Sequence, residues 1–189
     1  MPGRMKVLVP GWFVRGLLCC LPVLLLGGCT LAGNGPASGR NPEASAVWTA
    51  GIVSEPGRGE ERPVLLTGVR TGRHKGYDRL VFSFKGGSLP GYHLEYIDHP
   101  VRECGSGKVL GLPGDGWLLI RFRPARMHDA GGSTVSPLDR ALGYPVVLRL
   151  VRSCDFEGTV AWVAAVAEPE EFRAFALEGP TRLVVDISH

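Results

Sequence analysis

The residues best suited to chemistry in this 189-residue chain are clustered basic and aromatic side chains. One cluster surrounds a tyrosine between residues 70 and 79, and a second recurs at alternate positions of an apolar segment. Guanidinium groups pair with phosphate or carboxylate, and aromatic rings stack on the apolar faces of sugars. We therefore predict that these side chains bind an anionic polymer or a sugar. The candidate residues are Arg70, Arg73, Lys75, Tyr77 and Arg79 in the first cluster and Trp117, Arg121 and Arg123 in the second.

The first cluster also has an architectural interpretation. Residues 72–78 carry glycine at one end and Gly76 and Asp78 near the other, which is typical of a loop between two strands. In that case Asp78 pairs with Arg79 or caps the turn, and Tyr77 maintains the shape of the loop. We favour this simpler interpretation, and the sequence leaves the binding alternative open.

Catalytic motifs are incomplete throughout the chain. The stretch Gly105-Ser106-Gly107-Lys108 lacks the earlier glycine and the following hydroxyl of a phosphate-binding loop, and no Gly-x-Ser-x-Gly motif occurs. The five histidines show no His-x-x-x-His spacing, and no Cys-x-x-Cys pair occurs. A Cys-His nucleophile built from Cys104 or Cys154 would require a free thiol. We therefore expect no enzymatic activity, no metal and no cofactor.

The N-terminal segment determines where we expect the protein to act. Arg4, Lys6 and Arg15 precede a short apolar run that ends in Leu-Leu-Leu-Gly-Gly-Cys at residues 24–29. This arrangement resembles the lipobox of bacterial lipoprotein signal peptides. The resemblance implies that residues 1–28 are removed and that Cys29 carries the lipid, which would anchor the chain to the extracytoplasmic face of the cell membrane. The alternative, an uncleaved anchor helix starting at Val7, is disfavoured because the run is short and Pro22 interrupts it.

This assignment changes how charge and cysteines are interpreted. Three of the 21 basic residues and none of the 18 acidic ones precede Cys29, so the remaining chain is formally neutral and gives no reason to expect nucleic-acid binding. Cys19 and Cys20 would leave with the signal peptide, and Cys104 and Cys154 would remain. In an exported domain we expect these two to form a disulfide, the alternative being two buried thiols.

The elements that must position the candidate residues lie after a polar segment. Residues 29–62 are rich in Gly, Ala, Pro, Ser and Glu, which predicts a flexible linker, although Trp48 and Ile52 could dock on the domain or on a partner. Residues 63–189 predict one all-β domain, either a two-sheet sandwich or a closed barrel, with a long irregular connection over 124–144. The expected strands are 64–71, 79–85, 92–97, 117–123, 146–153, 159–166, 172–177 and 182–187.

Alternation with a period of two predicts which side chains face the core. We expect Leu80, Phe82 and Phe84 to share one face of their strand. Leu118, Ile120 and Phe122 should face the core from the strand at 117–123, with Trp117, Leu119, Arg121 and Arg123 facing away.

Three stretches together resemble the AMIN-like domain of actinobacterial lipoproteins and exported proteins. They are Thr67-Gly68-Val69-Arg70 with Gly76-Tyr77-Asp78-Arg79-Leu80-Val81-Phe82, then Asp155-Phe156-Glu157-Gly158, and finally Pro180-Thr181-Arg182-Leu183-Val184-Val185-Asp186-Ile187. The resemblance covers residues 63–189 and implies a two-sheet β-sandwich, an envelope location and a non-catalytic binding role. Cys154 stands where the family pattern has a glycine.

From these observations we expect a lipid-anchored envelope protein that binds cell-wall polymer, either peptidoglycan or an attached glycan. One alternative is an adaptor that recruits another exported protein through an exposed strand edge. A carrier of an apolar ligand inside the sandwich is a further alternative.

Overall fold

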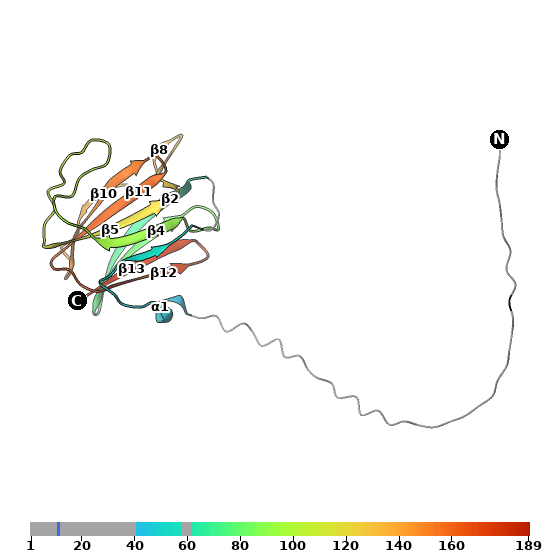
Figure 1. Cartoon of the computed structure of the whole chain (residues 1–189), viewed down its shortest axis with the longest axis horizontal. Coiled ribbons are helices and arrows are strands. Elements are labelled where there is room, and N and C mark those ends of the chain that lie inside the picture. Colours follow the sequence, from blue (N-terminus) through green and yellow to red (C-terminus); the bar gives the residue numbers. More distant parts are fainter. Residues whose placement is uncertain (1–10, 12–40, 58–61) are drawn as a thin grey trace, which may run out of the picture. The chain divides into compact units, whose positions relative to one another are not determined.

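Thirteen strands account for most of the part of the chain that the computed structural model describes (Figure 1). The structure describes residue 11, residues 41–57 and residues 62–189. The expected signal peptide, Cys29 and the first part of the linker lie outside these residues. The elements are α1 (Pro42–Ser45), β1 (Val53–Glu55), β2 (Val64–His74), β3 (Tyr77–Phe84), β4 (Gly91–Tyr96), β5 (Gly116–Arg123), β6 (Ala125–Arg126), β7 (His128–Asp129), β8 (Gly132–Ser133), β9 (Asp139–Ala141), β10 (Val147–Phe156), β11 (Thr159–Val166), β12 (Phe172–Leu177) and β13 (Arg182–Ser188).

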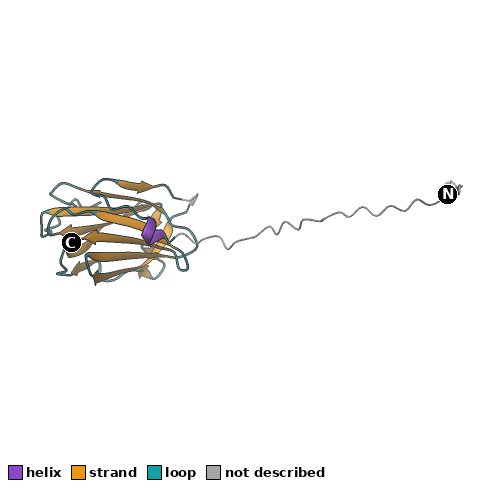
Figure 2. Ribbon diagram, turned by 90° about the horizontal axis from the view of Figure 1, so that it is seen from below, coloured by secondary structure: helices purple, strands orange, loops and turns teal. Residues whose placement is uncertain are grey.

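The strands form two facing sheets, which makes the domain a β-sandwich (Figure 2). One sheet has six strands in the order β1-β4-β5-β11-β10-β9, and the other has five in the order β12-β13-β3-β2-β6. Neighbouring strands pair antiparallel except β2 with β6, and β7 and β8 form a separate small hairpin. The predicted two-sheet sandwich is confirmed.

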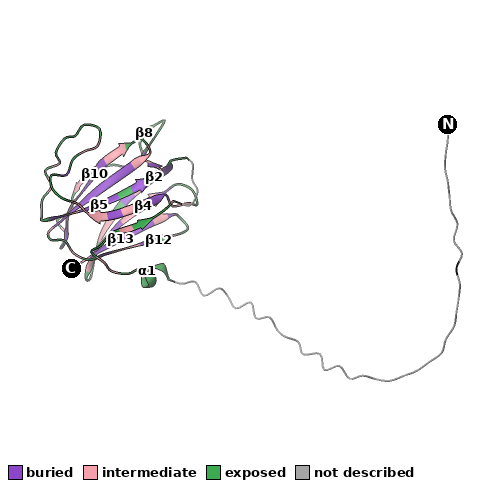
Figure 3. Ribbon diagram, viewed as in Figure 1, coloured by how far each residue is buried: buried purple, intermediate pink, exposed green. Residues whose placement is uncertain are grey.

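The core lies between the sheets and follows the predicted alternation. Leu80 and Phe82 from β3 and Leu118, Ile120 and Phe122 from β5 are fully buried, and the rings of Phe82 and Phe122 lie 5.1 Å apart. Strand β11 is buried along nearly its whole length (Figure 3). Burying such side chains is the main stabilising term for a domain of this size, because apolar surface leaves water.

The connection between the first two strands of the domain differs from the prediction. Instead of a loop over residues 72–78, β2 continues to His74 and β3 begins at Tyr77, so a two-residue turn closes the hairpin. Gly76 adopts a φ of 85°, which a residue with a Cβ atom rarely does. The turn residues near Asp78 suggested a loop, whereas cross-strand pairing extends the ladder almost to the glycine.

A second apolar cluster lies on the outer face of the six-stranded sheet. Trp117 and Leu119 do face away from the main core, as predicted, but they pack with Val101, Val151 and Val163 beneath the segment 97–112. Trp117 and Leu119 are therefore covered although they face away from the main core. Arg121 and Arg123, further along β5, are exposed.

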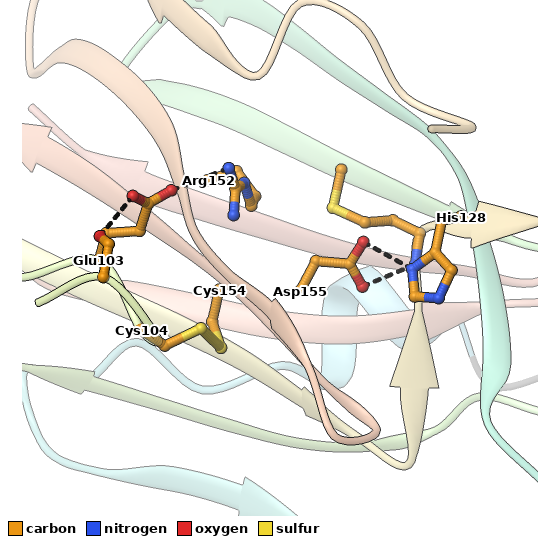
Figure 4. Close-up of a disulfide and its surroundings, with 8 residues drawn as sticks. Glu103, Cys104, His128, Arg152, Cys154 and Asp155 are labelled. Atoms are coloured by element: carbon orange, nitrogen blue, oxygen red, sulfur yellow. Dashed lines mark hydrogen bonds and ion pairs between the residues drawn. A yellow bond between two sulfur atoms is a disulfide. The ribbon is translucent and has the colours of Figure 1, made fainter. Parts of the chain in front are cut away.

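A disulfide holds this covering segment in place. Cys104 and Cys154 are bonded, which confirms the predicted pair, and the Cys104 amide donates to the Ser153 carbonyl at 2.9 Å. Arg152 also pairs with Glu103 at 3.0 Å. Figure 4 shows the two sulfurs with the neighbouring pairs Glu103–Arg152 and His128–Asp155. The end of β10 therefore fastens the segment to the sheet.

Part of the predicted linker is ordered. Strand β1 pairs antiparallel with β4, Thr49 exchanges two backbone hydrogen bonds with Phe172, and Trp48 packs against Arg173. Residues 41–57 of the predicted linker thus contact the domain, and Trp48 is a linker residue that docks on it. Within the part of the chain that is described, no helix is long and apolar enough to cross a membrane.

Candidate functional site

The predicted binding residues lie in two different sheets. Arg70, Arg73 and Lys75 belong to the β2–β3 hairpin of the five-stranded sheet, together with Tyr77 and Arg79. The second group, Trp117, Arg121 and Arg123, belongs to β5 of the six-stranded sheet. Since the sheets pack face to face, their outer sides point in opposite directions. The fold therefore does not bring the two groups into one site.

Asp186 organises the outer face of the five-stranded sheet. Its carboxylate is fully buried in the centre of β13, and its cross-strand partners are Arg173 in β12 and Arg79 in β3. Nε of Arg79 donates to Oδ1 of Asp186 at 2.6 Å, and Nε of Arg173 donates to Oδ2 at 2.9 Å. A buried carboxylate requires such partners, because an unpaired charge away from water is very costly.

A second carboxylate completes this network. Glu43 in α1 accepts hydrogen bonds at Oε1 from Nη2 of Arg79 at 2.8 Å and from Nη2 of Arg173 at 2.9 Å. The hydrogen bond to Asp186 is the main cause that raises the pKa of Arg79; burial opposes it, and the hydrogen bond to Glu43 adds to it. The network thus sets two guanidinium groups against two carboxylates.

Aromatic rings surround the two guanidinium groups. The guanidinium carbon of Arg173 lies 4.7 Å from the ring centre of Trp48, and that of Arg79 lies 5.1 Å from the ring centre of Tyr77. Phe175 lies 5.4 Å from the same carbon of Arg79, and His74 stacks on Tyr77 at 4.7 Å. Cation–π contacts of this kind strengthen as water is excluded. We call Arg79, Arg173 and Asp186 the arginine platform.

The platform corrects the predicted role of Asp78. Asp78 does not pair with Arg79 or cap the hairpin; its Oδ2 accepts hydrogen bonds from the backbone amides of Val146 and Val147, each at 2.9 Å. It is fully buried and therefore ties β3 to the start of β10. Arg79 turns to the opposite side of the strand, since neighbouring side chains alternate.

The remaining basic residues of the hairpin are available to a ligand. Arg70, Arg73 and Lys75 are exposed, and none of them pairs with a carboxylate among the residues described. Arg70 points to the same face as the stacked rings of His74 and Tyr77. Arg73 is the cross-strand neighbour of Asp78 and points to the opposite face, and Lys75 lies in the turn. This hairpin surface can attract an anionic chain and stack against a sugar ring.

The second predicted group is less suited to stacking on a sugar. Trp117 is half-buried, its ring centre lies 4.9 Å from that of His99, and its indole N–H is buried without a hydrogen-bond partner. Arg121 and Arg123 are exposed and line a hollow of about 250 Å³ with Tyr92 and His93. Two cations are thus accessible on this sheet, whereas the tryptophan is covered.

Sequence reasoning missed several residues of the site. Glu43 and Trp48 lay within the predicted linker, and Arg173 lay in a strand with no motif. One signal was available, because Asp186 follows three apolar residues in a strand. An aspartate at such a position predicts a buried partner of opposite charge. Another basic hollow, of about 370 Å³, is lined by Arg62, Lys85, Arg126 and Asp129 and also had no sequence signature.

The two cysteines cannot act as nucleophiles, because their sulfurs are bonded to each other. Among the described residues no group of three His, Cys, Asp or Glu side chains is placed to hold a metal ion. His128 and Asp155 lie 2.9 Å apart in an exposed position, where Asp155 also accepts the backbone amide of Met127. That pair holds the β7 segment against β10.

Comparison with known families supports the identity that this architecture suggests. The model of the AMIN-like domain matches residues 64–189, which include both long sheets except β1. The chain belongs to the AMIN-like domain family. AMIN-like domains occur in extracytoplasmic proteins, which indicates a role associated with the cell wall or envelope. No curated protein and no solved structure matches the chain at a significant level. In this AMIN-like domain, the arginine platform and the exposed hairpin cations share one sheet.

Proposed function

We propose that this AMIN-like protein is a non-catalytic binding protein of the cell envelope that holds cell-wall polymer, either peptidoglycan or an attached glycan. Cys29 would carry a lipid that anchors it to the extracytoplasmic face of the membrane. The lipobox-like segment at residues 24–29 supports the anchor. Membership in the AMIN-like family supports the envelope role.

One observation carries the binding proposal. The β2–β3 hairpin exposes Arg70, Arg73 and Lys75 without carboxylate partners among the residues described. Its outer face also carries the stacked rings of His74 and Tyr77, on the same side as Arg70. The neighbouring cations Arg79 and Arg173 are already neutralised by Asp186 and Glu43. The three free charges are therefore the part of the hairpin that is available to an external anion.

Co-sedimentation with purified insoluble cell wall tests the proposal. The chain from Thr30 to His189, which retains every strand, should pellet with the wall at low salt and less at high salt, because salt screens exposed charges. The Arg70→Gln/Arg73→Gln variant should pellet several-fold less, by about fivefold if each charge contributes a few tenths of a kcal/mol to 1 kcal/mol.

The matched control removes two exposed arginines from the opposite sheet. Arg121→Gln/Arg123→Gln changes the net charge equally and should pellet like the parent chain. If this variant loses binding instead, the polymer binds the six-stranded sheet. If the parent chain stays in the supernatant at both salt concentrations, wall binding is wrong.

A second candidate function is recruitment of an exported protein. Strand β12 is the edge of its sheet, and edge strands accept additional strands. Binding of that kind would persist after enzymatic digestion of the wall polymer, whereas retention by polymer would not.

A further inference from the structure

The arginine platform carries one more positive charge than Asp186 neutralises, so it can bind one further anion. Arg79 and Arg173 carry two positive charges, and Asp186 in the same sheet carries one negative charge. The Nη2 atoms of both arginines converge on a single oxygen, Oε1 of Glu43, at 2.8 and 2.9 Å. Without Glu43 the platform would be a half-buried site with one excess positive charge and two donors aimed at one point. Such geometry favours a carboxylate.

The surroundings of the platform make this position selective. The side chains of Arg79 and Arg173 are 19% and 13% exposed, so their hydrogen bonds are partly shielded from water. The Tyr77 and Phe175 rings pack against the guanidinium groups, the latter 5.7 Å from the guanidinium carbon of Arg173. Charge pairs strengthen as the local dielectric falls.

The segment that supplies Glu43 is held by polar and aromatic contacts rather than by burial in the apolar core. We call residues 41–49 the strap. Helix α1 has four residues and buries none of them, and the Glu43 side chain is 38% exposed. Val47 is 77% exposed, and no strap residue belongs to either apolar cluster. A single helical turn is not stable by itself in water, so the strap can leave without disrupting the core.

The strap also shows how an extended chain approaches the platform. Thr49 exchanges two backbone hydrogen bonds with Phe172, at 2.9 and 2.8 Å, on the outer side of β12. In an antiparallel ladder every second residue directs its backbone groups to the same side, so those of Ala174 point the same way as those of Phe172. Among the residues described, no other strand pairs along this edge. An incoming peptide could therefore pair with β12 while its carboxylate reaches the arginines.

From these contacts we propose that the arginine platform is a binding site for the carboxylate of an acidic, extended peptide, and that the strap occupies this site with Glu43 until such a peptide displaces it. The inference goes beyond the proposed binding of wall polymer by the hairpin. It assigns a second site, a ligand chemistry and an internal competitor. A covalently attached competitor acts at an effective concentration on the order of millimolar, so Glu43 sets the threshold that a ligand must exceed.

Peptide binding to the chain from Thr30 to His189 tests the inference. The probe is a fluorescent copy of residues 41–49, Asn-Pro-Glu-Ala-Ser-Ala-Val-Trp-Thr, and the matched probe carries Gln in place of Glu. In the Glu43→Gln protein, whose own carboxylate is absent, the Glu probe should bind about tenfold more tightly than the Gln probe. The parent protein should bind the Glu probe about tenfold more weakly than the Glu43→Gln protein does.

Two further variants locate the site in the Glu43→Gln background. Arg173→Gln should abolish binding of the Glu probe, whereas Arg182→Gln, which removes a charge from the neighbouring strand β13, should leave it unchanged. Backbone amide spectra show whether each variant is folded. The comparison of the Glu and Gln probes is made with both arginines intact, so it does not depend on the folding of an arginine variant.

Equal binding of the two probes to the Glu43→Gln protein, or binding of neither, would overturn the inference. These outcomes are independent of wall sedimentation, which is measured with Glu43 intact and depends on Arg70 and Arg73. Failure of one proposal is therefore distinguishable from failure of the other.

Discussion

At the scale of single residues, charge burial distinguishes the aspartates of this domain. Asp186 is fully buried between Arg79 and Arg173, whereas Asp139 pairs with Arg149 at the surface and is 47% exposed. The first carboxylate has lost its water and relies on two guanidinium groups. The second retains its hydration. The same ion-pair chemistry should therefore contribute very differently to stability at the two positions.

We expect Asp186→Asn to lower the free energy of unfolding by about 3 kcal/mol, because two half-buried arginines lose a buried charged partner. Asp139→Asn is the matched control and should cost less than about 1 kcal/mol. Urea unfolding measures both. Equal losses in the two variants would contradict the role assigned to burial.

The control pair also has a defined pH dependence. The hydrogen bond from Arg149 holds the pKa of Asp139 below its ordinary value. Its small stabilising contribution is present above the pKa of the unfolded chain and is lost as pH falls through the lowered pKa of the folded state. Near neutral pH, at which unfolding would be compared, this contribution is fully present.

At the scale of elements, the disulfide determines whether segment 97–112 stays on its sheet. Cys104 and Cys154 are separated by 50 residues in the sequence, and Cys104 lies within the segment that covers Trp117 and Leu119. The backbone hydrogen bonds that join this segment to the sheet include Cys104 N–H to Ser153 O and Ile97 N–H to Trp117 O. The covalent link compensates for the absence of a regular strand.

Replacing both cysteines with serine should lower the free energy of unfolding by about 4 kcal/mol in the chain-entropy account, since the unfolded chain gains the freedom of the open loop. Amide hydrogen exchange should accelerate in segment 97–112 and much less in β3 and β13. Reductant should affect the parent chain and leave the double variant unchanged. Unaltered exchange in segment 97–112 would mean that the apolar cluster alone holds it.

At the scale of the whole molecule, the ordered N-terminal segment joins the domain at its five-stranded sheet. The strap contacts Arg79 and Arg173 there, and β1 then crosses to pair with β4 in the other sheet. The point at which the strap meets the domain therefore lies on the same sheet as the hairpin cations Arg70 and Arg73. Under the proposed function, the membrane anchor and the ligand would therefore both be connected to the domain through the five-stranded sheet.

Cys29→Ala in the full-length chain should move the protein from the membrane fraction to the soluble fraction outside the cell, because the acyl chains supply the membrane affinity. Membrane fractionation followed by detection of the protein measures this. The thermal unfolding midpoint of the released chain should equal that of the chain starting at Thr30. Continued membrane association of the variant would contradict the lipid anchor.

Local patterns in the sequence determined the strands and their faces. Alternation in Leu80-Val81-Phe82 and Leu118-Leu119-Ile120 reports which side chains are buried, because consecutive residues of a strand point to opposite sides. The three AMIN-like stretches indicated the family for a related reason, since each is confined to one hairpin, one turn, or one strand with the turn before it. The pairing of Cys104 with Cys154 followed from the small number of cysteines left after the expected signal peptide.

Tertiary structure alone decided the composition of the site. Arg79 meets Asp186 across 107 residues and Arg173 meets Glu43 across 130, so no local spacing records either contact. The split of the predicted basic residues between two sheets, the cover over Trp117 and the docking of the strap likewise depend on strand order. Strand order is set by how all apolar faces are buried together, and that is a property of the whole chain rather than of any segment.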